Sequence, residues 1–236
     1  LNFYLQFCVH GSLLREYSMR FKGRFKRPDI ADEYAIVLDY MPMGNPYDKH
    51  TFHRSIPVAQ GIGSKYFTLV EIVPPRGRNL VIGERIPVSL YPRGYEIKVF
   101  DRLAYEDLTS VARVNLNKVV QDIVLEKEKI FVEFFNIAEA INIRLHSLEL
   151  LPGIGKKTLT TILEERKKKS FENFEDLKKR VKIGDPVKII VERIVLEIQR
   201  SEKYYLFVEP FPPSPDYVFL NYLQLLYERV DYVEPW

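Results

Sequence analysis

The sequence predicts an α+β protein in which a small OB-like antiparallel β-barrel precedes a helical domain. Two observations carry this prediction. Within residues 33–105, short β-rich segments alternate with Gly- and Pro-containing turns, a pattern typical of small closed barrels. From Glu106 onward, apolar residues instead recur at helical spacing. A chain of 236 residues has room for two small domains of this kind.

The expected barrel has five short strands, each rich in β-branched and aromatic residues and each followed by a turn. We expect these strands at residues 33–40, 57–61, 66–73, 81–88 and 95–100. The third of them ends in a basic turn, Pro74-Pro75-Arg76-Gly77-Arg78. A plain antiparallel sheet would produce the same pattern and is the alternative to a barrel.

The helical domain is expected to span residues 106–208, and the two ends of the chain differ from it in character. Residues 1–32 form a basic N-terminal arm, with five Lys or Arg residues between Arg20 and Arg27. Residues 209–236 form a Pro-rich acidic C-terminal tail, in which 217–230 has the pattern of an amphipathic helix. This helix could fold back on the body of the protein or dock on a partner.

The most informative motif is the stretch Leu-Pro-Gly-Ile-Gly-Lys-Lys at residues 151–157. We expect a helical run over 145–151, a tight turn at Gly153 and Gly155, and a second helix that opens with Lys156 and Lys157. Because glycine adopts backbone angles that other residues resist, the turn can present free helix N–H groups to a phosphate. This is the pattern of a helix-hairpin-helix motif. A simple helical corner with a Gly cap is the alternative.

A weak internal repeat suggests that a second hairpin follows the first. A shift of 29 residues aligns Ile183-Gly184-Asp185-Pro186 with Ile154-Gly155-Lys156-Lys157. The second copy has Asp185 and Pro186 where the first has two lysines. Because a carboxylate repels phosphate and proline has no N–H to donate, we expect the second hairpin to be structural. The predicted arrangement is therefore a tandem helix-hairpin-helix domain.

Basic side chains in both domains are the candidate nucleic-acid-binding residues, because Lys and Arg neutralise phosphates. Tyr66, Phe67, Tyr91, Tyr95 and Phe100 of the barrel are candidates for stacking on bases, although alternate strand residues must point inward. The residues assigned to backbone binding are Gly153, Ile154, Gly155, Lys156, Lys157, Lys167, Lys168, Lys169, Arg76, Arg78, Arg93 and Lys65.

Other chemistries find little support in the sequence. His50, His53 and Asp48 could begin a metal site, but no further ligand is evident nearby, so we assign no metal and no cofactor. No nucleophile motif or suitably spaced carboxylate pair indicates an enzyme. The single cysteine, Cys8, excludes an internal disulfide. No apolar run is long enough to span a membrane, and we expect a cytoplasmic protein.

The barrel region together with three segments resembles one archaeal family, that of domain-of-unknown-function 655. The three segments are residues 145–157, the run Ile-Leu-Glu-Glu-Arg-Lys-Lys-Lys at 162–169, and Phe-Glu-Asn-Phe-Glu-Asp-Leu at 171–177. The resemblance covers roughly residues 33–207. It implies an OB-like barrel followed by tandem helix-hairpin-helix motifs, RNA or nucleotide binding, and a link to translation or ribosome biogenesis, without an established activity.

We therefore expect a non-catalytic RNA-binding protein that acts on ribosomal RNA or a ribosomal particle. The balanced overall charge, +3, says little about partners, but residues 156–193 contain twelve Lys or Arg against seven Asp or Glu. Such local excess fits a polyanion ligand. One alternative is a DNA-repair or recombination accessory that uses the hairpin on duplex DNA. A second alternative is a protein-interaction adaptor that works through its acidic tail.

Overall fold

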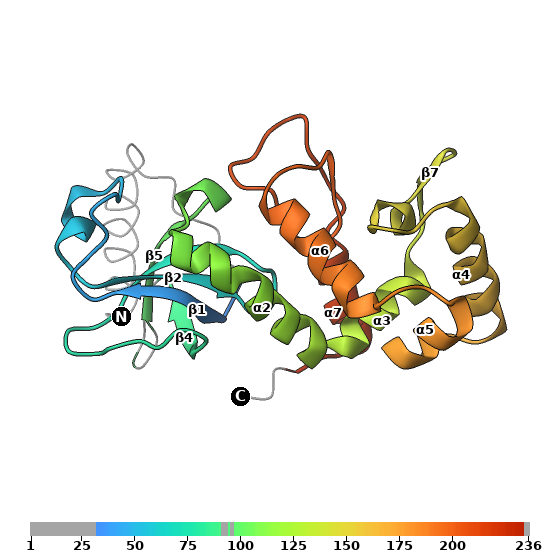
Figure 1. Cartoon of the computed structure of the whole chain (residues 1–236), viewed down its shortest axis with the longest axis horizontal. Coiled ribbons are helices and arrows are strands. Elements are labelled where there is room, and N and C mark those ends of the chain that lie inside the picture. The colour runs from blue at the N-terminus through green and yellow to red at the C-terminus, as the bar shows by residue number, and fades with distance from the viewer. Residues whose placement is uncertain (1–31, 91–93, 95–96, 234–236) are drawn as a thin grey trace, which may run out of the picture.

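Five strands close into a barrel at one end of the molecule, and helices extend from it to the other end (Figure 1). The computed structural model describes residues 32–90, 94 and 97–233 of the chain. The barrel strands are β1 (Tyr34–Met41), β2 (Val58–Gly63), β3 (Leu69–Val73), β4 (Arg85–Ser89) and β5 (Ile97–Arg102). The α+β class and the small closed barrel are confirmed, and the barrel is consistent with an OB-like one. The expected basic arm, residues 1–32, lies almost wholly outside the described residues.

The strands follow the order β1-β2-β3-β5-β4 around the barrel. Neighbouring strands are antiparallel, except that β4 and β5 pair in parallel, with Val88 opposite Ile97. Register shifts that indicate bulges occur in β1, between Val37 and Asp39, and in the pairing of β3 with β5. Bulges bend strands and increase their twist, which helps a short sheet to close.

Successive strand residues face opposite sides of the barrel wall, and both sides are buried. In β1, Ala35 and Val37 belong to the interior core of the barrel, whereas Ile36 and Leu38 belong to a second core that the helices complete. Helix α2 (Ser110–Glu126) packs against β1 over this second core. The barrel and the helices therefore share apolar packing across the boundary that the change of periodicity marks near residue 105.

The remaining helices are α3 (Glu128–Ile137), α4 (Lys156–Lys168), α5 (Phe174–Val181), α6 (Pro186–Ile198) and α7 (Tyr222–Val230). Several helix starts follow directly from residue type, because short polar side chains accept from first-turn amides. The side chain of Thr109 caps α2, that of Asn173 caps α5, and that of Asp185 caps α6. Proline at the first position of α6 supplies a backbone φ suited to a helix, and its missing N–H would have had no partner within the helix.

The helix expected over 145–151 is not present, and this prediction is wrong. The chain instead forms a small antiparallel pair of strands, β6 (Ala140–Asn142) and β7 (Leu145–His146), and then a 3₁₀ helix over Ser147–Leu150. His146 explains the change. The ring Nδ1 of His146 accepts a hydrogen bond from the Leu148 N–H, and the backbone N–H of His146 donates to the Glu149 carboxylate. The side chains of His146 and Glu149 thus close the 3₁₀ turn. Apolar periodicity alone did not reveal this capping.

The C-terminal amphipathic helix folds back on the body of the protein. Helix α7 packs against α3 and buries Leu223, Leu226 and Tyr227. It begins at Tyr222, five residues later than expected, because Val218–Phe219 (β9) pairs with Tyr204–Tyr205 (β8). The fully buried Lys127 donates from Nζ to the Ser64 carbonyl and to the Tyr227 hydroxyl. This contact links α7 to the turn after β2.

A buried ion pair on α6 holds the segment that precedes this tail. Arg193 Nε donates to Glu197 at 2.7 Å, and both side chains are almost fully buried. The carboxylate of Glu197 also accepts hydrogen bonds from the amides of Leu206, Phe207 and Val208. Because these donors satisfy the buried charge, the pair is compatible with burial and determines the path of residues 204–208.

Candidate nucleic-acid interface and a buried histidine–carboxylate cluster

The loop before α4 has the backbone geometry expected of a phosphate-binding turn. Gly153 has φ of 78°, in the left-handed region that favours glycine, and Gly155 is the N-cap of α4 in an extended conformation. Leu151 and Ile154 are buried and secure the loop to the core. The side chain of Ile154 therefore cannot contact a ligand, although the glycines on either side of it are exposed.

No side chain caps the N-terminus of α4 within the described chain. Its first-turn N–H groups have no partner within the helix, as at every helix start, and the partial positive charge of the helix dipole lies there. The start of α6 differs, because the Asp185 carboxylate accepts from the Val187 N–H. The first turn is thus uncapped and the second is capped by Asp185, while the predicted difference in phosphate binding stays a prediction.

The lysines assigned to this end are exposed but are not equivalent. Lys156 Nζ forms an ion pair with Glu149 at 2.7 Å and donates to the Arg144 carbonyl. Lys168 pairs with Glu165 and Lys169 pairs with Glu172. Such surface pairs contribute roughly 0–1 kcal/mol and exchange readily for another anion. Lys157 and Lys167 are exposed on the same helix and extend the positive charge along it.

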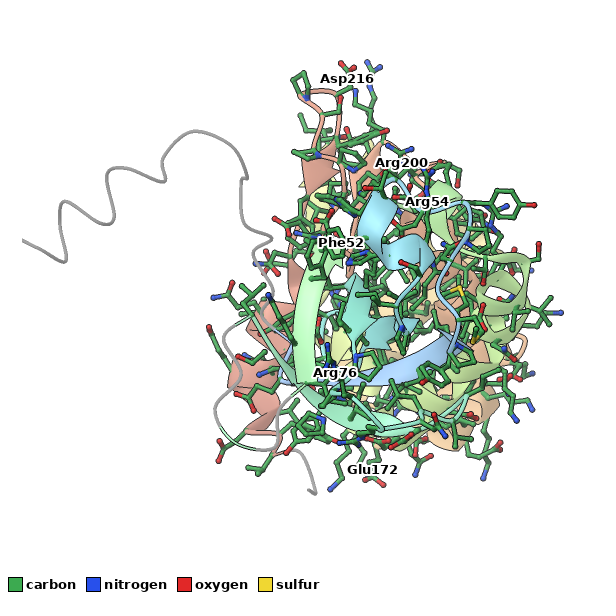
Figure 2. All side chains as sticks on the ribbon, turned by 90° about the vertical axis from the view of Figure 1, so that its left-hand side faces the viewer. Phe52, Arg54, Arg76, Glu172, Arg200 and Asp216 are labelled. Atoms are coloured by element: carbon green, nitrogen blue, oxygen red, sulfur yellow. The ribbon has the colours of Figure 1, made fainter. Side chains whose placement is uncertain are left out.

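The connection between β3 and β4, which carries Arg76 and Arg78, belongs to the barrel, which lies at the opposite end of the molecule from α4 (Figure 1). Arg76 is exposed on the connection between β3 and β4, as the view onto the barrel end shows (Figure 2), and Arg78 pairs with Glu84 at 3.2 Å. Arg93 lies outside the described residues. The structure therefore does not bring all the predicted basic residues onto one surface.

Lys65 lies in a turn whose amides are already occupied. The Asp32 carboxylate accepts hydrogen bonds from the N–H groups of Lys65 and Tyr66, at 2.7 Å and 2.8 Å. An internal carboxylate thus takes the place that a bound phosphate would need in this turn. The ammonium of Lys65 lies over the rings of Tyr66 and Tyr227.

The described aromatic side chains that were candidates for stacking on bases take part in packing within the protein. Phe67 is buried in the shared core, so it is one of the inward-facing members of this set and cannot stack on a base, and Tyr66 packs against Tyr227. Tyr91 and Tyr95 lie outside the described residues. Among the described residues, Tyr47 and Phe52 are aromatic side chains exposed at the barrel end, 94% and 48% exposed on the connection between β1 and β2. Their loop position carried no periodic signal that could have marked them.

That same connection contributes to a cluster of four potential metal ligands. Asp48, His50 and His53 come from residues 48–53, and Glu71 comes from β3. One ligand atom from each lies within 4.8 Å of the other three. The ring of Phe100, on β5, contacts both imidazoles edge-on, with centroid distances of 5.0 Å and 4.2 Å. Asp48, His50 and His53 are close enough in the sequence to suggest a metal site, but Glu71 is separated from them in the chain and adjacent only in the folded barrel.

Burial shapes the protonation of this cluster. Burial and a hydrogen bond with Asp48 together raise the pKa of Glu71 to about 9. Burial acts to raise the pKa of Asp48 as well, but the hydrogen bonds that it accepts from Glu71 and from the His50 amide leave it lowered. The pKa of His53 is lowered, chiefly by burial. Without a cation, the two carboxyl groups therefore share a proton and the His53 ring is neutral.

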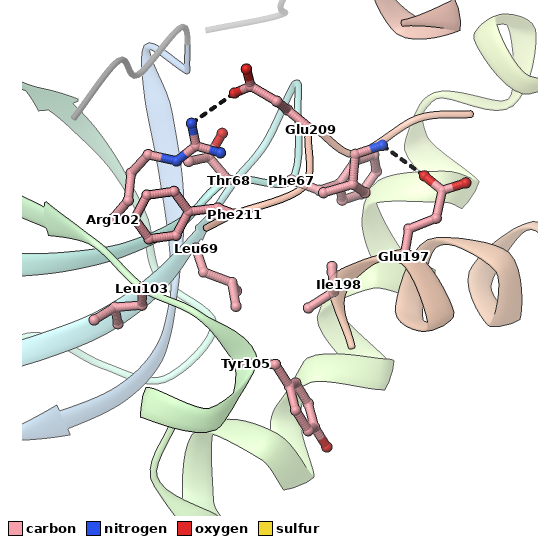
Figure 3. A pocket seen from close by; sticks show the side chains of 11 residues that line it. Phe67, Thr68, Leu69, Arg102, Leu103, Tyr105, Glu197, Ile198, Glu209 and Phe211 are labelled. Carbon is pink, nitrogen blue, oxygen red and sulfur yellow. Dashed lines mark hydrogen bonds and ion pairs between the residues drawn. The ribbon is translucent and has the colours of Figure 1, made fainter. Parts of the chain in front are cut away.

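A small pocket lies where the barrel meets α6 and the tail (Figure 3). Arg102 pairs with Glu209 at 2.7 Å there, and its guanidinium lies over the ring of Phe211. Glu197, on another side, accepts backbone hydrogen bonds as described above. Arg102 and Glu209 pair with each other, and Glu197 pairs with Arg193 and the backbone amides, so these charged groups make contacts within the fold.

Comparison with known proteins assigns the chain to a group of archaeal sequences. A family model described as "Protein of unknown function (DUF655)" matches residues 31–209. The uncharacterized protein MJ0038 of Methanocaldococcus jannaschii is 41% identical over 193 residues, which cover 81% of this chain and 86% of that protein. The crystal structure of Af1531 from Archaeoglobus fulgidus, a DUF655 protein, has a TM-score of 0.67 and 45% identity, and covers 75% of this chain and 100% of that one. In the described part of the chain, no helix has the length and apolar character needed to cross a membrane.

Proposed function

This chain belongs to the DUF655 family, and we propose that it is a non-catalytic RNA-binding protein that holds the phosphate backbone at the N-terminus of α4. The observation that carries the proposal is the uncapped start of this helix, with Gly155 at the N-cap and Lys157 in the first turn. Amides at a helix start and a nearby cation are a suitable site for a phosphate. The loop would act as the first half of a helix-hairpin-helix motif whose leading helix is reduced to a 3₁₀ turn.

The charge of the surrounding surface supports a polyanion as the ligand. Between residues 144 and 192, five acidic residues are exposed: Glu164, Glu172, Glu175, Asp185 and Glu192. Ten basic residues are exposed in the same segment: Arg144, Lys156, Lys157, Lys167, Lys168, Lys169, Lys178, Lys179, Lys182 and Lys188. A twofold excess of cations concentrates nucleic acid at this end and makes binding depend on salt.

Ribosomal RNA or a ribosomal particle is the target that the family resemblance favours. Duplex DNA is the alternative, because amides and lysines hold a phosphate backbone without reading bases. Competition between a structured RNA and a duplex DNA of equal length separates these two ligands. Co-migration of the native protein with ribosomal subunits in a sedimentation gradient is the outcome expected for the ribosomal target.

The substitution Gly155→Asp tests the proposed site directly. A Cβ at Gly155 meets no atom within 4 Å, so the new side chain fits without strain. Its carboxylate would cap α4 as Asp185 caps α6, and would occupy the place of the phosphate. We expect RNA affinity to fall about tenfold or more, since a hydrogen bond to a charged group contributes roughly 1.5–3 kcal/mol, while the thermal stability is unchanged or slightly raised.

Gly184→Asp is the matched control, because a Cβ at Gly184 also meets nothing within 4 Å. It adds the same charge beside a helix start that Asp185 already caps. We expect a loss of affinity of less than about twofold, measured by fluorescence anisotropy at one salt concentration. Equal losses in the two variants would show that the α4 turn holds no phosphate.

A further inference from the structure

We propose that Asp48, His50, His53 and Glu71 bind a zinc ion that fastens the connection between β1 and β2 to the barrel. The four residues come from two segments of chain that meet only in the folded protein. Three lie within the 42–57 connection, and the fourth is on β3, on the outer surface of the barrel. This site is separate from the nucleic-acid interface at α4.

The distances between the ligand atoms suit a tetrahedral ion. Zinc bonds of roughly 2.0–2.1 Å to nitrogen and oxygen place neighbouring ligand atoms about 3.3 Å apart. Four ligand atoms, one from each residue, lie within 4.8 Å of one another. The nitrogen–oxygen separations, which involve both oxygens of Asp48, lie on both sides of about 3.3 Å. His53 Nδ1 is 2.7 Å from Glu71 Oε2 and 3.6 Å from Asp48 Oδ2. His50 Nδ1 is 3.4 Å from Asp48 Oδ1 and 3.8 Å from Glu71 Oε2.

Four polar atoms of this cluster are buried without a hydrogen-bond partner in the described part of the chain. His53 is 0% exposed, and neither of its ring nitrogens makes a hydrogen bond. His50 Nδ1 and Glu71 Oε2 are also buried without a partner. Each unsatisfied buried polar group costs roughly 1–3 kcal/mol. A metal ion bound between these side chains would give the imidazole nitrogens and the Glu71 oxygen a partner.

The nearby charged side chains do not replace a cation. Lys49 pairs with Asp101 at 3.1 Å, on the neighbouring strand β5. Arg54 donates from Nε to the Asp48 carbonyl and not to its carboxylate. The backbone N–H of His50 donates to Asp48 Oδ1 at 2.7 Å. This last contact orients a ligand carboxylate, as the hydrogen-bonding shell around metal sites commonly does.

The donor set selects the class of ion. Two imidazole nitrogens and two carboxylate oxygens match zinc and similar first-row divalent metals. Calcium and magnesium instead favour sites built wholly from oxygen. Because the protein itself supplies four ligands, the site has the closed coordination of structural zinc and lacks the open position of a catalytic one.

The ion would stabilise a connection that has little regular structure of its own. Residues 42–57 contain only the 3₁₀ helix Thr51–Arg54, and they carry the exposed Tyr47 and Phe52. Within the connection, the Asn45 N–H donates to the His53 carbonyl. At Gly44, whose φ is +88°, a Cβ would lie 2.5 Å from the Arg54 backbone, so the two halves pack in direct contact. A metal ion held by both this loop and Glu71 would attach the loop to β3.

The test is a metal titration of the full-length chain after its metal has been removed with a chelator. We expect one zinc ion per chain, a higher Tm when Zn²⁺ is added, and no comparable rise with Mg²⁺ at the same concentration. Co²⁺ in place of zinc should give the visible absorption of a tetrahedral site. Absence of stoichiometric Zn²⁺ binding by the wild-type chain, or an equal rise in Tm with Mg²⁺, would overturn the proposal.

Three variants separate this site from adventitious binding. His53→Asn and Glu71→Gln should weaken Zn²⁺ binding by on the order of a hundredfold or more, given that even supporting residues contribute 10–100-fold. Glu71→Gln removes a buried carboxyl without a change of shape, so it remains informative if His53→Asn does not fold. His146→Asn removes a different buried histidine and should bind Zn²⁺ like the wild type. Wild-type affinity in a folded Glu71→Gln variant would contradict the assignment.

Discussion

Two buried histidines of this molecule differ in whether their ring nitrogens have hydrogen-bond partners. His53 has ring nitrogens without partners, and we infer that it binds a metal. His146 has a partner, because its Nδ1 accepts a hydrogen bond from the Leu148 N–H at 3.1 Å. Only the neutral imidazole can accept in this way. The two residues therefore share a type and a degree of burial but differ in chemistry.

His146 should make the stability of the protein depend on pH. Burial and the nearby Arg166 lower its pKa below the usual 6.5, while Glu149 and Glu139 oppose the shift. A lowered folded-state pKa means that the unfolded chain binds the proton more readily. The contribution of neutral His146 to the free energy of unfolding is therefore complete above about pH 6.5. It is lost as the pH falls through the folded-state pKa of His146.

The measurement compares the wild type with His146→Asn by urea denaturation between pH 7.5 and pH 5. Asparagine caps a helical turn with an oxygen acceptor and does not titrate. We expect the free energy of unfolding to decrease with falling pH less steeply in the variant than in the wild type. Parallel curves for the two proteins would mean that His146 tolerates protonation in the folded state.

At the scale of elements, the two helix starts differ in the residue that forms the N-cap. Asp185 caps α6 with its own carboxylate, whereas Gly155 leaves α4 open to an external anion. The similarity between the two copies does not extend to the segments that lead into them. Helix α5 precedes the second turn, but β7 and a 3₁₀ helix precede the first. Residue-level capping, and not the repeat, determines which turn can bind a ligand.

Helix α7 is an integral element of the fold, and a pair of adjacent leucines tests this. Leu226 is 0% exposed against the core, whereas Leu225 is 47% exposed on the same helix. We expect Leu226→Ala to lower the free energy of unfolding by about 2–5 kcal/mol. Leu225→Ala should change it by roughly 0.5 kcal/mol or less. Thermal denaturation of the full-length variants measures both.

Similar small effects from the two leucine substitutions would show that α7 is only loosely attached. That result would favour the alternative in which the tail binds a partner protein. Lys127 donates both to the Tyr227 hydroxyl on α7 and to the Ser64 carbonyl in the turn after β2. Undocking of α7 would therefore remove a contact next to this turn as well. Deletion of residues 209–236 would therefore expose apolar core, and a loss of function after deletion would not by itself identify an interaction tail.

At the scale of the whole molecule, two candidate contact regions lie at opposite ends. The open start of α4 lies in the helical end, while Arg76, Tyr47 and Phe52 lie at the barrel end (Figures 1 and 2). The apolar core shared by the barrel and the helices joins the two ends. Dissection into fragments would expose this core, so recognition has to be tested in the full chain.

The separation of the two ends predicts a dependence on the length of the RNA. Arg76→Ala should weaken binding of a long structured RNA that spans the molecule. The slope of log K against log salt should also become less steep, by about 0.7–0.9 for one lost phosphate contact. A short hairpin held at α4 alone should bind the variant and the wild type equally. Gly155→Asp should weaken both ligands.

Binding isotherms at several salt concentrations, with both RNAs and both variants, test this dependence on RNA length. The double variant should show additive losses for the long RNA, because the two positions share no contacts. An Arg76→Ala effect of equal size on both RNAs would place the hairpin ligand at the barrel end. No effect on either RNA would leave the arginine without a role in binding.

Local signals in the sequence were sufficient for much of the architecture. Alternating β-rich runs with Gly and Pro turns located all five barrel strands to within a few residues, since strand pattern and turn chemistry act over short stretches. The Gly153 and Gly155 turn was identified in the same way. The helix expected over 145–151 failed because the side chains of His146 and Glu149 close a different turn there, and apolar spacing contains no information about such capping.

The sequence by itself thus determined the class of fold, the barrel strands and the difference between an open and a capped helix start. The tertiary structure alone decided which charged groups are neighbours. It brought Glu71 to the histidines of a loop 18 residues earlier in the chain, counted from His53, and it placed Arg76 far from α4. It also buried Phe67 and left Tyr47 exposed. These positions depend on closure of the barrel and on packing of the shared core. Both are contacts between segments far apart in the chain, which no local sequence pattern can indicate.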